Sequence, residues 1–126
     1  MRLVVDATAI IAILTHDTTI DQLLAKATDI IAPDFAVVEV RNLRRKYRRA
    51  SLAAPGLEPI LAFFDRITIV SSRAYAFDAD ELSAELDHPI DDCLYAAVAR
   101  REDGKLLTAD RRFARRLEGR LDVAVF

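Results

Sequence analysis

The sequence predicts a single α/β domain, residues 1–126, with a mostly parallel central sheet flanked by helices on both faces. Short runs rich in Val, Ile and Leu alternate along the chain with segments whose apolar residues recur at helical spacing. Hydrophobic residues make up 52% of the composition, with 3 Gly and 4 Pro, which favours a compact fold over a disordered one. A chain of this length has room for one domain around one core.

Five segments are predicted to be strands. The first is purely apolar and ends at Asp6, and the second stops at Pro33. Asp103-Gly104 is a turn sequence that leads into the fourth strand. In chain order the predicted strands are Leu3–Val5, Asp29–Ala32, Ile67–Val70, Lys105–Thr108 and Leu121–Phe126.

Helices are predicted between these strands. Thr18 or Thr19 is the expected cap of the second helix, and Pro33 is expected in the first turn of the third. The turn Pro55–Pro59 leads into the fourth, and His88-Pro89 separates the fifth from the sixth. In chain order the predicted helices are Thr8–Leu14, Thr18–Ala27, Pro33–Arg49, Pro59–Phe64, Asp78–Leu86, Ile90–Arg101 and Asp110–Arg116.

Cysteine content and hydropathy indicate where the protein functions. Cys93 is the only cysteine, so no intramolecular disulfide forms, and we expect it to be a small core residue. The apolar run Ala7–Leu14 is much shorter than the roughly 20 residues that span a bilayer. Asp6 interrupts the apolar stretch that a signal peptide needs. We therefore expect a cytoplasmic protein with no membrane association.

Charge is unevenly distributed although the formal net charge is only −2. Six of the nine residues in Arg41–Arg49 are basic, whereas Asp78–Asp92 contains seven acids and no Lys or Arg. The basic segment is the natural contact for an RNA backbone, although its six cations cannot all share one helical face. Within it we expect Tyr47 to pack against the core rather than to stack on a base.

Four acids from separate elements are the candidate metal ligands and catalytic residues. Strands that alternate with helices bring polar residues together at the carboxyl edge of the sheet. Carboxylates that converge there need a divalent cation, and hard oxygen ligands suit Mg²⁺ or Mn²⁺. Taken singly, each acid also has a structural explanation: Asp6 and Asp110 as helix caps, Asp92 as an acid in a first helical turn, and Glu39 as a side chain that extends to solvent. The candidates are Asp6, Glu39, Asp92 and Asp110.

The order of these acids along the chain resembles that of the PIN-domain ribonucleases, in particular the VapC toxins of prokaryotic toxin–antitoxin pairs. The resembling motifs are Leu3–Thr8, Glu39–Asn42, His88–Ala99 and Leu107–Phe113. The resemblance covers essentially the whole chain and implies a PIN-like nuclease domain. It also implies Mg²⁺- or Mn²⁺-dependent cleavage of RNA phosphodiesters by a homodimer that a small antitoxin protein neutralises.

One position departs from the family pattern. Where the family often has an uncharged residue before its third acid, this chain has Asp91, and the register with Leu94-Tyr95 assigns Asp92 to the site. Thr8 and Thr108 are candidates to hydrogen-bond the carboxylates. His88 is expected to be a turn residue without an acid–base partner.

Two other functions remain open at this point. One is a catalytically inactive, regulatory binding domain of the same fold. The other, weaker alternative is a phosphatase that uses Asp6 as its nucleophile, in which Thr8 replaces the second acid of the D-x-D motif of haloacid-dehalogenase-like proteins.

Overall fold

A five-stranded sheet forms the centre of the protein, which is described by a computed structural model covering residues 1–126. Its strand order is β3-β2-β1-β4-β5, and every neighbouring pair is parallel. The prediction of an α/β fold with a mostly parallel sheet is confirmed. The strands are β1 (Arg2–Val5), β2 (Asp29–Pro33), β3 (Thr68–Val70), β4 (Lys105–Thr108) and β5 (Asp122–Val125).

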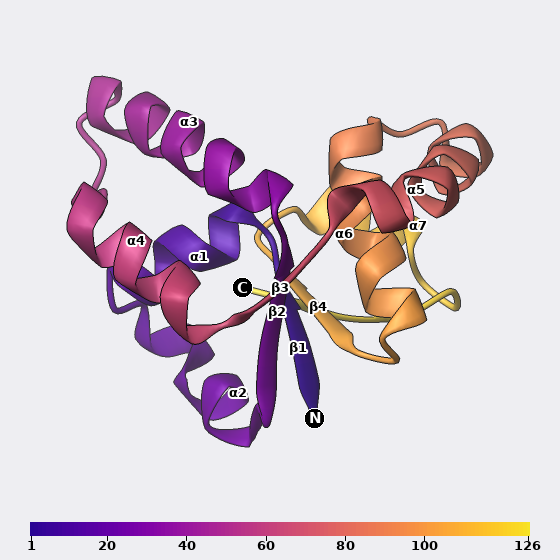
Figure 1. The fold of residues 1–126 in the computed structure, drawn as a ribbon, viewed down its shortest axis with the longest axis horizontal. Helices are drawn as coiled ribbons and strands as arrows, with labels where there is room; N and C mark the ends of the chain where they lie inside the picture. Colours follow the sequence, from indigo (N-terminus) through magenta and orange to yellow (C-terminus); the bar gives the residue numbers. More distant parts are fainter.

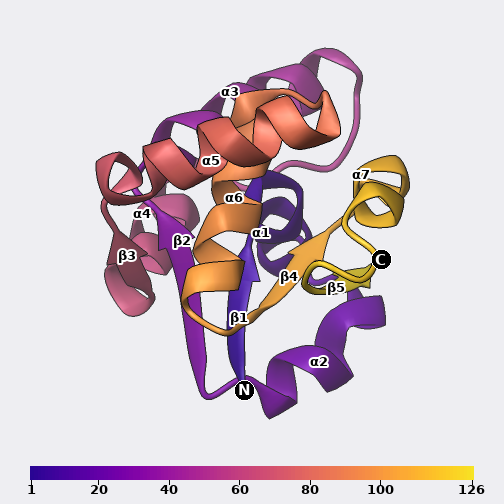
Figure 2. The same ribbon diagram turned by 90° about the vertical axis from the view of Figure 1, so that its right-hand side faces the viewer.

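Helices cover both faces of the sheet (Figures 1 and 2). One face carries α1 (Ala7–Leu14), α2 (Asp21–Lys26) with a short 3-10 turn before it (Thr18–Ile20), α3 (Phe35–Arg49) and α4 (Leu57–Arg66). The other face carries α5 (Ser72–Leu86), α6 (Ile90–Arg101) and α7 (Arg111–Arg116). None of the α-helices combines the length and the apolar character that crossing a bilayer requires.

The core lies between the central strands and α6. Leu3, Val4 and Val5 of β1 are completely buried, as is expected for a central strand covered on both faces. Every residue from Cys93 to Ala99 of α6 is buried, because α6 is enclosed between the sheet and α5. Its alanines, with their small side chains, let the helix approach the strands closely.

Three of the boundaries that differ from the predictions have a structural cause. Helix α5 begins at Ser72 rather than Asp78. The hydroxyl and amide of Ser72 donate hydrogen bonds to the carboxylate of Asp34, which lies between β2 and α3. Strand β2 continues through Pro33, which pairs with β3, so α3 begins at Phe35. The 3-10 turn before α2 is capped by the Asp17 carboxylate and not by a threonine.

The topology defines where a ligand fits. From β1 the chain proceeds to β2 and β3, and it then crosses the sheet to β4 on the other side of β1. Neighbouring strands β1 and β4 are thus followed by connections that lead to opposite faces, which opens a crevice at their carboxyl ends. Asp6 directly follows β1, and Asp110 comes two residues after β4.

Candidate functional site

Three of the four predicted acids line one pocket at this edge of the sheet. The pocket has a volume of about 210 Å³ and collects side chains from the end of β1, from α1, from α3 and from the start of α6. Its polar lining consists of Asp6, Thr8, Glu39, Asn42, Lys46, Asp91 and Asp92.

Asp6 combines a structural contact with its place in the pocket. Its Oδ1 accepts hydrogen bonds from the Ala9 amide (2.9 Å), which caps α1, and from the Thr8 hydroxyl (2.6 Å). Burial raises the pKa of the Asp6 carboxyl, hydrogen bonds from Thr108, Thr8 and Ala9 offset part of that rise, and the charge of Asp92 adds to it. The bonds from Ala9 and Thr8 both end on Oδ1, so the capping role of Asp6 uses one oxygen of the carboxyl.

Two threonines connect the ends of β1 and β4. The Thr8 hydroxyl accepts a hydrogen bond from the Ala109 amide (3.1 Å), and the Thr108 hydroxyl accepts one from the Asp110 amide (3.1 Å). Thr108 is the one polar residue with a buried side chain, at 1% exposure. Both hydroxyls therefore lie where they can orient carboxylates, as the sequence suggested.

Glu39 reaches the pocket from the second turn of α3. Its Oε1 accepts a hydrogen bond of 2.7 Å from the hydroxyl of Tyr95 on α6. Burial raises the pKa of the Glu39 carboxyl, the Tyr95 hydroxyl lowers it in part, and the charges of Asp91, Asp92 and Asp6 raise it further. The Tyr95 bond and the shared pocket lining place Glu39 beside the other acids.

Asp92 is held by His88, which lies one helical turn earlier. His88 Nε2 and Asp92 Oδ2 are 2.7 Å apart, and the nitrogen donates because an ionised carboxylate only accepts. The His88 ring stacks on Phe113 of α7, with centroids 4.2 Å apart, and its side chain is 9% exposed. Burial raises the pKa of Asp92, the His88 hydrogen bond lowers it in part, and the charges of Asp91 and Asp110 raise it. The expectation that His88 has no partner is wrong.

Asp110 lies beside Asp92 and does not line the pocket itself. Its Oδ1 accepts a hydrogen bond from the Phe113 amide (2.9 Å) and caps α7. One ligand atom from each of His88, Asp92 and Asp110 falls within a span of 4.8 Å. Asp110 is thus close to one member of the acidic group, and Asp92 is the residue that connects it to the others.

The charges of this group are suited to a hard divalent cation. Three carboxyls have raised pKa values, and each of the three is raised in part by at least one other acid of the pocket. Carboxylate oxygens from separate elements that repel one another are the donor set that Mg²⁺ and Mn²⁺ prefer. The donor chemistry of Asp6, Glu39 and Asp92 therefore fits such an ion.

Three contributors to the site were not predicted from the sequence. The short spacing of His88 and Asp92 was a usable signal, because a residue just before a helix lies close to the acids of its first turn. Tyr95 was a polar-tipped residue in an otherwise apolar stretch, three positions after Asp92. Lys46 belongs to the basic segment but faces the acidic pocket, and nothing in the sequence distinguished it from its neighbours.

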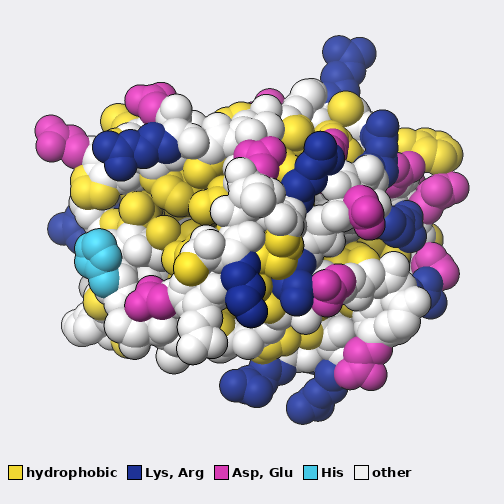
Figure 3. Space-filling view, turned by 90° about the horizontal axis from the view of Figure 1, so that it is seen from below, with side chains coloured by type: hydrophobic (Ala, Val, Ile, Leu, Met, Phe, Trp, Pro, Cys, Tyr) yellow, Lys and Arg dark blue, Asp and Glu magenta, His cyan; other side chains and the backbone are white.

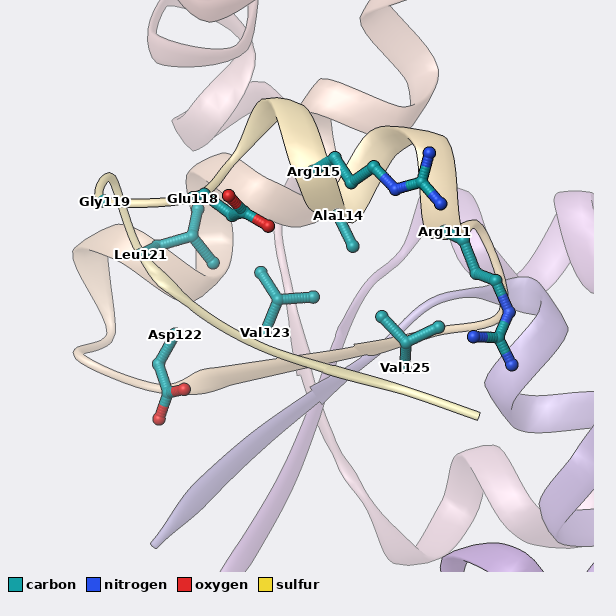
Figure 4. Close-up of a pocket in the computed structure, with 9 residues that line it drawn as sticks. All are labelled: Arg111, Ala114, Arg115, Glu118, Gly119, Leu121, Asp122, Val123 and Val125. Atoms are coloured by element: carbon teal, nitrogen blue, oxygen red, sulfur yellow. The ribbon is translucent and has the colours of Figure 1, made fainter.

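The remaining features noted in the sequence do not line the acidic pocket. Tyr47 packs in part against the core, and Cys93 is fully buried, both as predicted. A hollow of about 400 Å³ lies between α7 and β5, where Val123 and Val125 form an apolar floor beside Arg111 (Figure 4). None of the four candidate acids lines that hollow, so we place the candidate site in the acidic pocket.

Fold and pocket together define an α/β protein with a carboxylate centre at the switch point of a parallel sheet. The PIN domain family model matches residues 3–117, and the chain belongs to the PIN-domain family. A curated relative, Ribonuclease VapC3 from Pyrobaculum aerophilum, is 33% identical over 122 residues, which cover 90% of this chain and 93% of the relative.

Solved structures share the fold over almost the full length. The structure of VapBC2 from Rickettsia felis, bound to a DNA fragment from its promoter, matches with a TM-score of 0.70 at 22% identity and covers 100% of this chain and 99% of that chain. A toxin–antitoxin complex from Klebsiella pneumoniae matches with a TM-score of 0.73 at 15% identity and covers 98% and 96%. At these identities the likeness establishes the fold of the chain.

Proposed function

We propose that this protein is a divalent-metal-dependent endoribonuclease whose catalytic and metal-binding residues are Asp6, Glu39, Asp92 and Asp110. The observation that carries the proposal is the convergence of carboxylates from the end of β1, from α3 and from α6 on one pocket, where the pKa of each is raised in part by another acid. The name of the curated relative, a ribonuclease, supports RNA as the substrate.

Side chains of the protein hold the acids in place for this reaction. The Thr8 hydroxyl fixes Asp6, the Tyr95 hydroxyl fixes Glu39, and His88 fixes Asp92. When bound, Mg²⁺ or Mn²⁺ supplies charge for a phosphate oxygen and acidifies a coordinated water. Because an anionic phosphate must enter an acidic pocket, the ammonium of Lys46 at its wall attracts and orients the substrate.

The protein is further proposed to be the toxin of a toxin–antitoxin pair. The support is the VapC name of the relative and the toxin–antitoxin complex from Klebsiella pneumoniae among the structures that share the fold. The expected partners are RNA, a small antitoxin protein and a second copy of the chain. Growth arrest on solitary expression, relieved by co-expression of the protein encoded beside it, tests this role. A harmless solitary protein with high ribonuclease activity contradicts the toxin role and leaves the nuclease intact.

The replacement Asp6→Asn tests the nuclease. An amide keeps the size and the capping acceptor of Asp6 but removes the charge that balances the cation. Cleavage of RNA under Mg²⁺ or Mn²⁺ should fall by at least about a hundredfold. The matched control is Asp80→Asn, which removes an exposed carboxylate of α5 and should leave activity unchanged.

The outcome also separates the alternatives. Full activity of Asp6→Asn contradicts the shared-metal site. A parent protein that binds Mn²⁺ without cleaving RNA is instead an inactive binding domain of the same fold.

A further inference from the structure

Most arginines of α3 lie away from the face of the helix that lines the acidic pocket. Successive helical residues are about 100° apart, so Glu39, Asn42 and Lys46 project to one side. Arg41, Arg44 and Arg48 lie roughly 130° to 170° around the axis from these residues, Arg45 about 95°, and Arg49, in the last turn, only about 50°. They line a separate hollow of about 590 Å³ beside the start of α4, formed by Arg41, Arg44, Arg45, Arg48, Arg49 and Leu57. These five arginines are called the arginine face below.

None of the five guanidinium groups is paired with a carboxylate. The only hydrogen bond of the arginine face is donated by Arg44 Nε to the carbonyl of Pro55 (2.8 Å). Elsewhere on the protein, four basic side chains are paired with carboxylates, in Arg2–Glu102, Arg101–Asp78, Lys105–Asp122 and Arg120–Glu85. The surface seen from below in Figure 3 likewise shows basic and acidic side chains interspersed. The arginine face is therefore a concentration of unbalanced positive charge on a protein whose net charge is −2.

A purely structural explanation accounts for only part of this charge. Cations in the last turn of a helix are stabilised by its macrodipole, and Arg48 and Arg49 lie in that turn of α3. Arg41, Arg44 and Arg45 precede the last turn and gain little from the dipole. Five like charges around one hollow repel one another, which favours a polyanionic ligand.

We propose that the arginine face is a second phosphate-binding surface, which holds a segment of the RNA substrate away from the bond that is cleaved. The proposal rests on the nuclease function proposed above. Planar guanidinium groups bind phosphate oxygens in a bidentate manner. The face carries no exposed aromatic side chain on which a base could stack, so it contacts the backbone without reading sequence.

The composition of the hollow favours RNA over a protein partner. A docked peptide helix gains most of its affinity from apolar anchors, and Leu57 is the one hydrophobic residue in the lining. Helix α3 also connects the two surfaces. Lys46 lines the acidic pocket, and its neighbour Arg45 lines the hollow of the arginine face. An RNA that is long enough to pass around α3 contacts both, whereas a short oligonucleotide contacts only the pocket.

The test uses the triple variant Arg41→Gln/Arg45→Gln/Arg48→Gln, since all three side chains are exposed and make no hydrogen bond in the structure. The matched control, Arg66→Gln/Arg73→Gln/Arg100→Gln, removes the same charge from exposed positions on other helices. A third variant with Lys at positions 41, 45 and 48 keeps the charge. Melting temperatures of all variants verify that they are folded.

Binding is measured by fluorescence anisotropy over a range of salt concentrations, in the Asp6→Asn background so that the RNA stays intact. For a long single-stranded RNA, the slope of log K against log salt should become shallower by about 2 in the Gln triple, because each lost phosphate contact accounts for about 0.7. The control and Lys variants should keep the parental slope within about 0.5.

Cleavage kinetics give the second readout. They are measured with Asp6 intact, so that the protein is active. The Gln triple should raise KM for the long RNA by about tenfold or more while kcat and the cleavage of a short oligonucleotide stay unchanged. Equal slopes and equal KM values for the Gln triple and its control overturn the proposal. Unchanged RNA binding with loss of inhibition by a partner protein also overturns it and assigns the face to that partner. If the parent cleaves no RNA, the nuclease proposal fails. The salt dependence of RNA binding still shows whether the arginine face binds phosphates.

Discussion

At the scale of single residues, the site depends on hydrogen-bond donors that carry no charge of their own. Tyr95 is 1% exposed, and its ring packs against Phe35 while its hydroxyl reaches Glu39. Burial raises the pKa of Tyr95, and the Glu39 carboxylate raises it further, so this phenol stays a donor throughout the physiological range. Tyr95 therefore acts as a positioning residue that fixes the direction of the Glu39 carboxylate.

The variant Tyr95→Phe removes only this hydroxyl. Mn²⁺ affinity, measured by calorimetry without RNA, should fall by about tenfold, which is the usual effect of losing a residue that orients a metal ligand. The free energy of unfolding, measured in urea, should fall by about 1 kcal/mol, as for the loss of a single hydrogen bond. The control Tyr75→Phe removes a phenol that donates to Glu102 outside the pocket, and it should leave Mn²⁺ affinity unchanged. Equal Mn²⁺ affinity in both variants would assign Tyr95 a purely structural role.

At the scale of elements, α6 presents two adjacent acids in different environments. Asp92 is half-buried and bonded to His88, whereas Asp91 is exposed, and the two side chains project about 100° apart. Asp92→Asn should therefore reduce cleavage at least about tenfold more than Asp91→Asn does. Parallel assays of the two variants under Mg²⁺ are sufficient, because each serves as the control for the other. A loss at Asp91 that equals or exceeds the loss at Asp92 contradicts the register proposed for this motif.

The elements also show how far the sequence determines the site. Apolar periodicity and Pro, Gly and Asp signals located every strand and helix, because these are local properties of the chain. The start of α5 was misplaced because the contact that fixes it, from Ser72 to Asp34, joins residues 38 positions apart. Contacts such as Tyr95 to Glu39, which are 56 positions apart, depend on the packing of α6 against α3 in the same way. Three of the four acids proposed from the sequence line one pocket, whereas the donors Tyr95 and His88 were not predicted.

At the scale of the whole molecule, the acidic pocket lowers the stability of the metal-free fold. Burial raises the pKa of the Asp6 carboxyl above its value in the unfolded chain, so the folded state binds that proton more tightly. The stability from this group is present below the unfolded-state pKa and is lost as the pH rises through the folded-state pKa. Above the folded-state pKa the ionised carboxylate thus destabilises the fold, and Asp92, whose pKa is raised too, adds to the effect.

Metal binding reverses this cost, since an ion that binds only the folded state stabilises it by mass action. The metal-free Asp6→Asn variant should therefore melt a few degrees above the metal-free parent at neutral pH, by roughly 4 °C for each 1 kcal/mol relieved. Saturating Mn²⁺ should raise the melting temperature of the parent and leave that of Asp6→Asn nearly unchanged. Asp80→Asn, which removes an exposed carboxylate, should follow the parent in both conditions. A metal-free Asp6→Asn protein that melts below the parent would mean that the cap and the threonine hydrogen bonds of Asp6 outweigh its burial. The Asp6 carboxylate would then stabilise the metal-free fold through its hydrogen bonds, and its primary role would be structural.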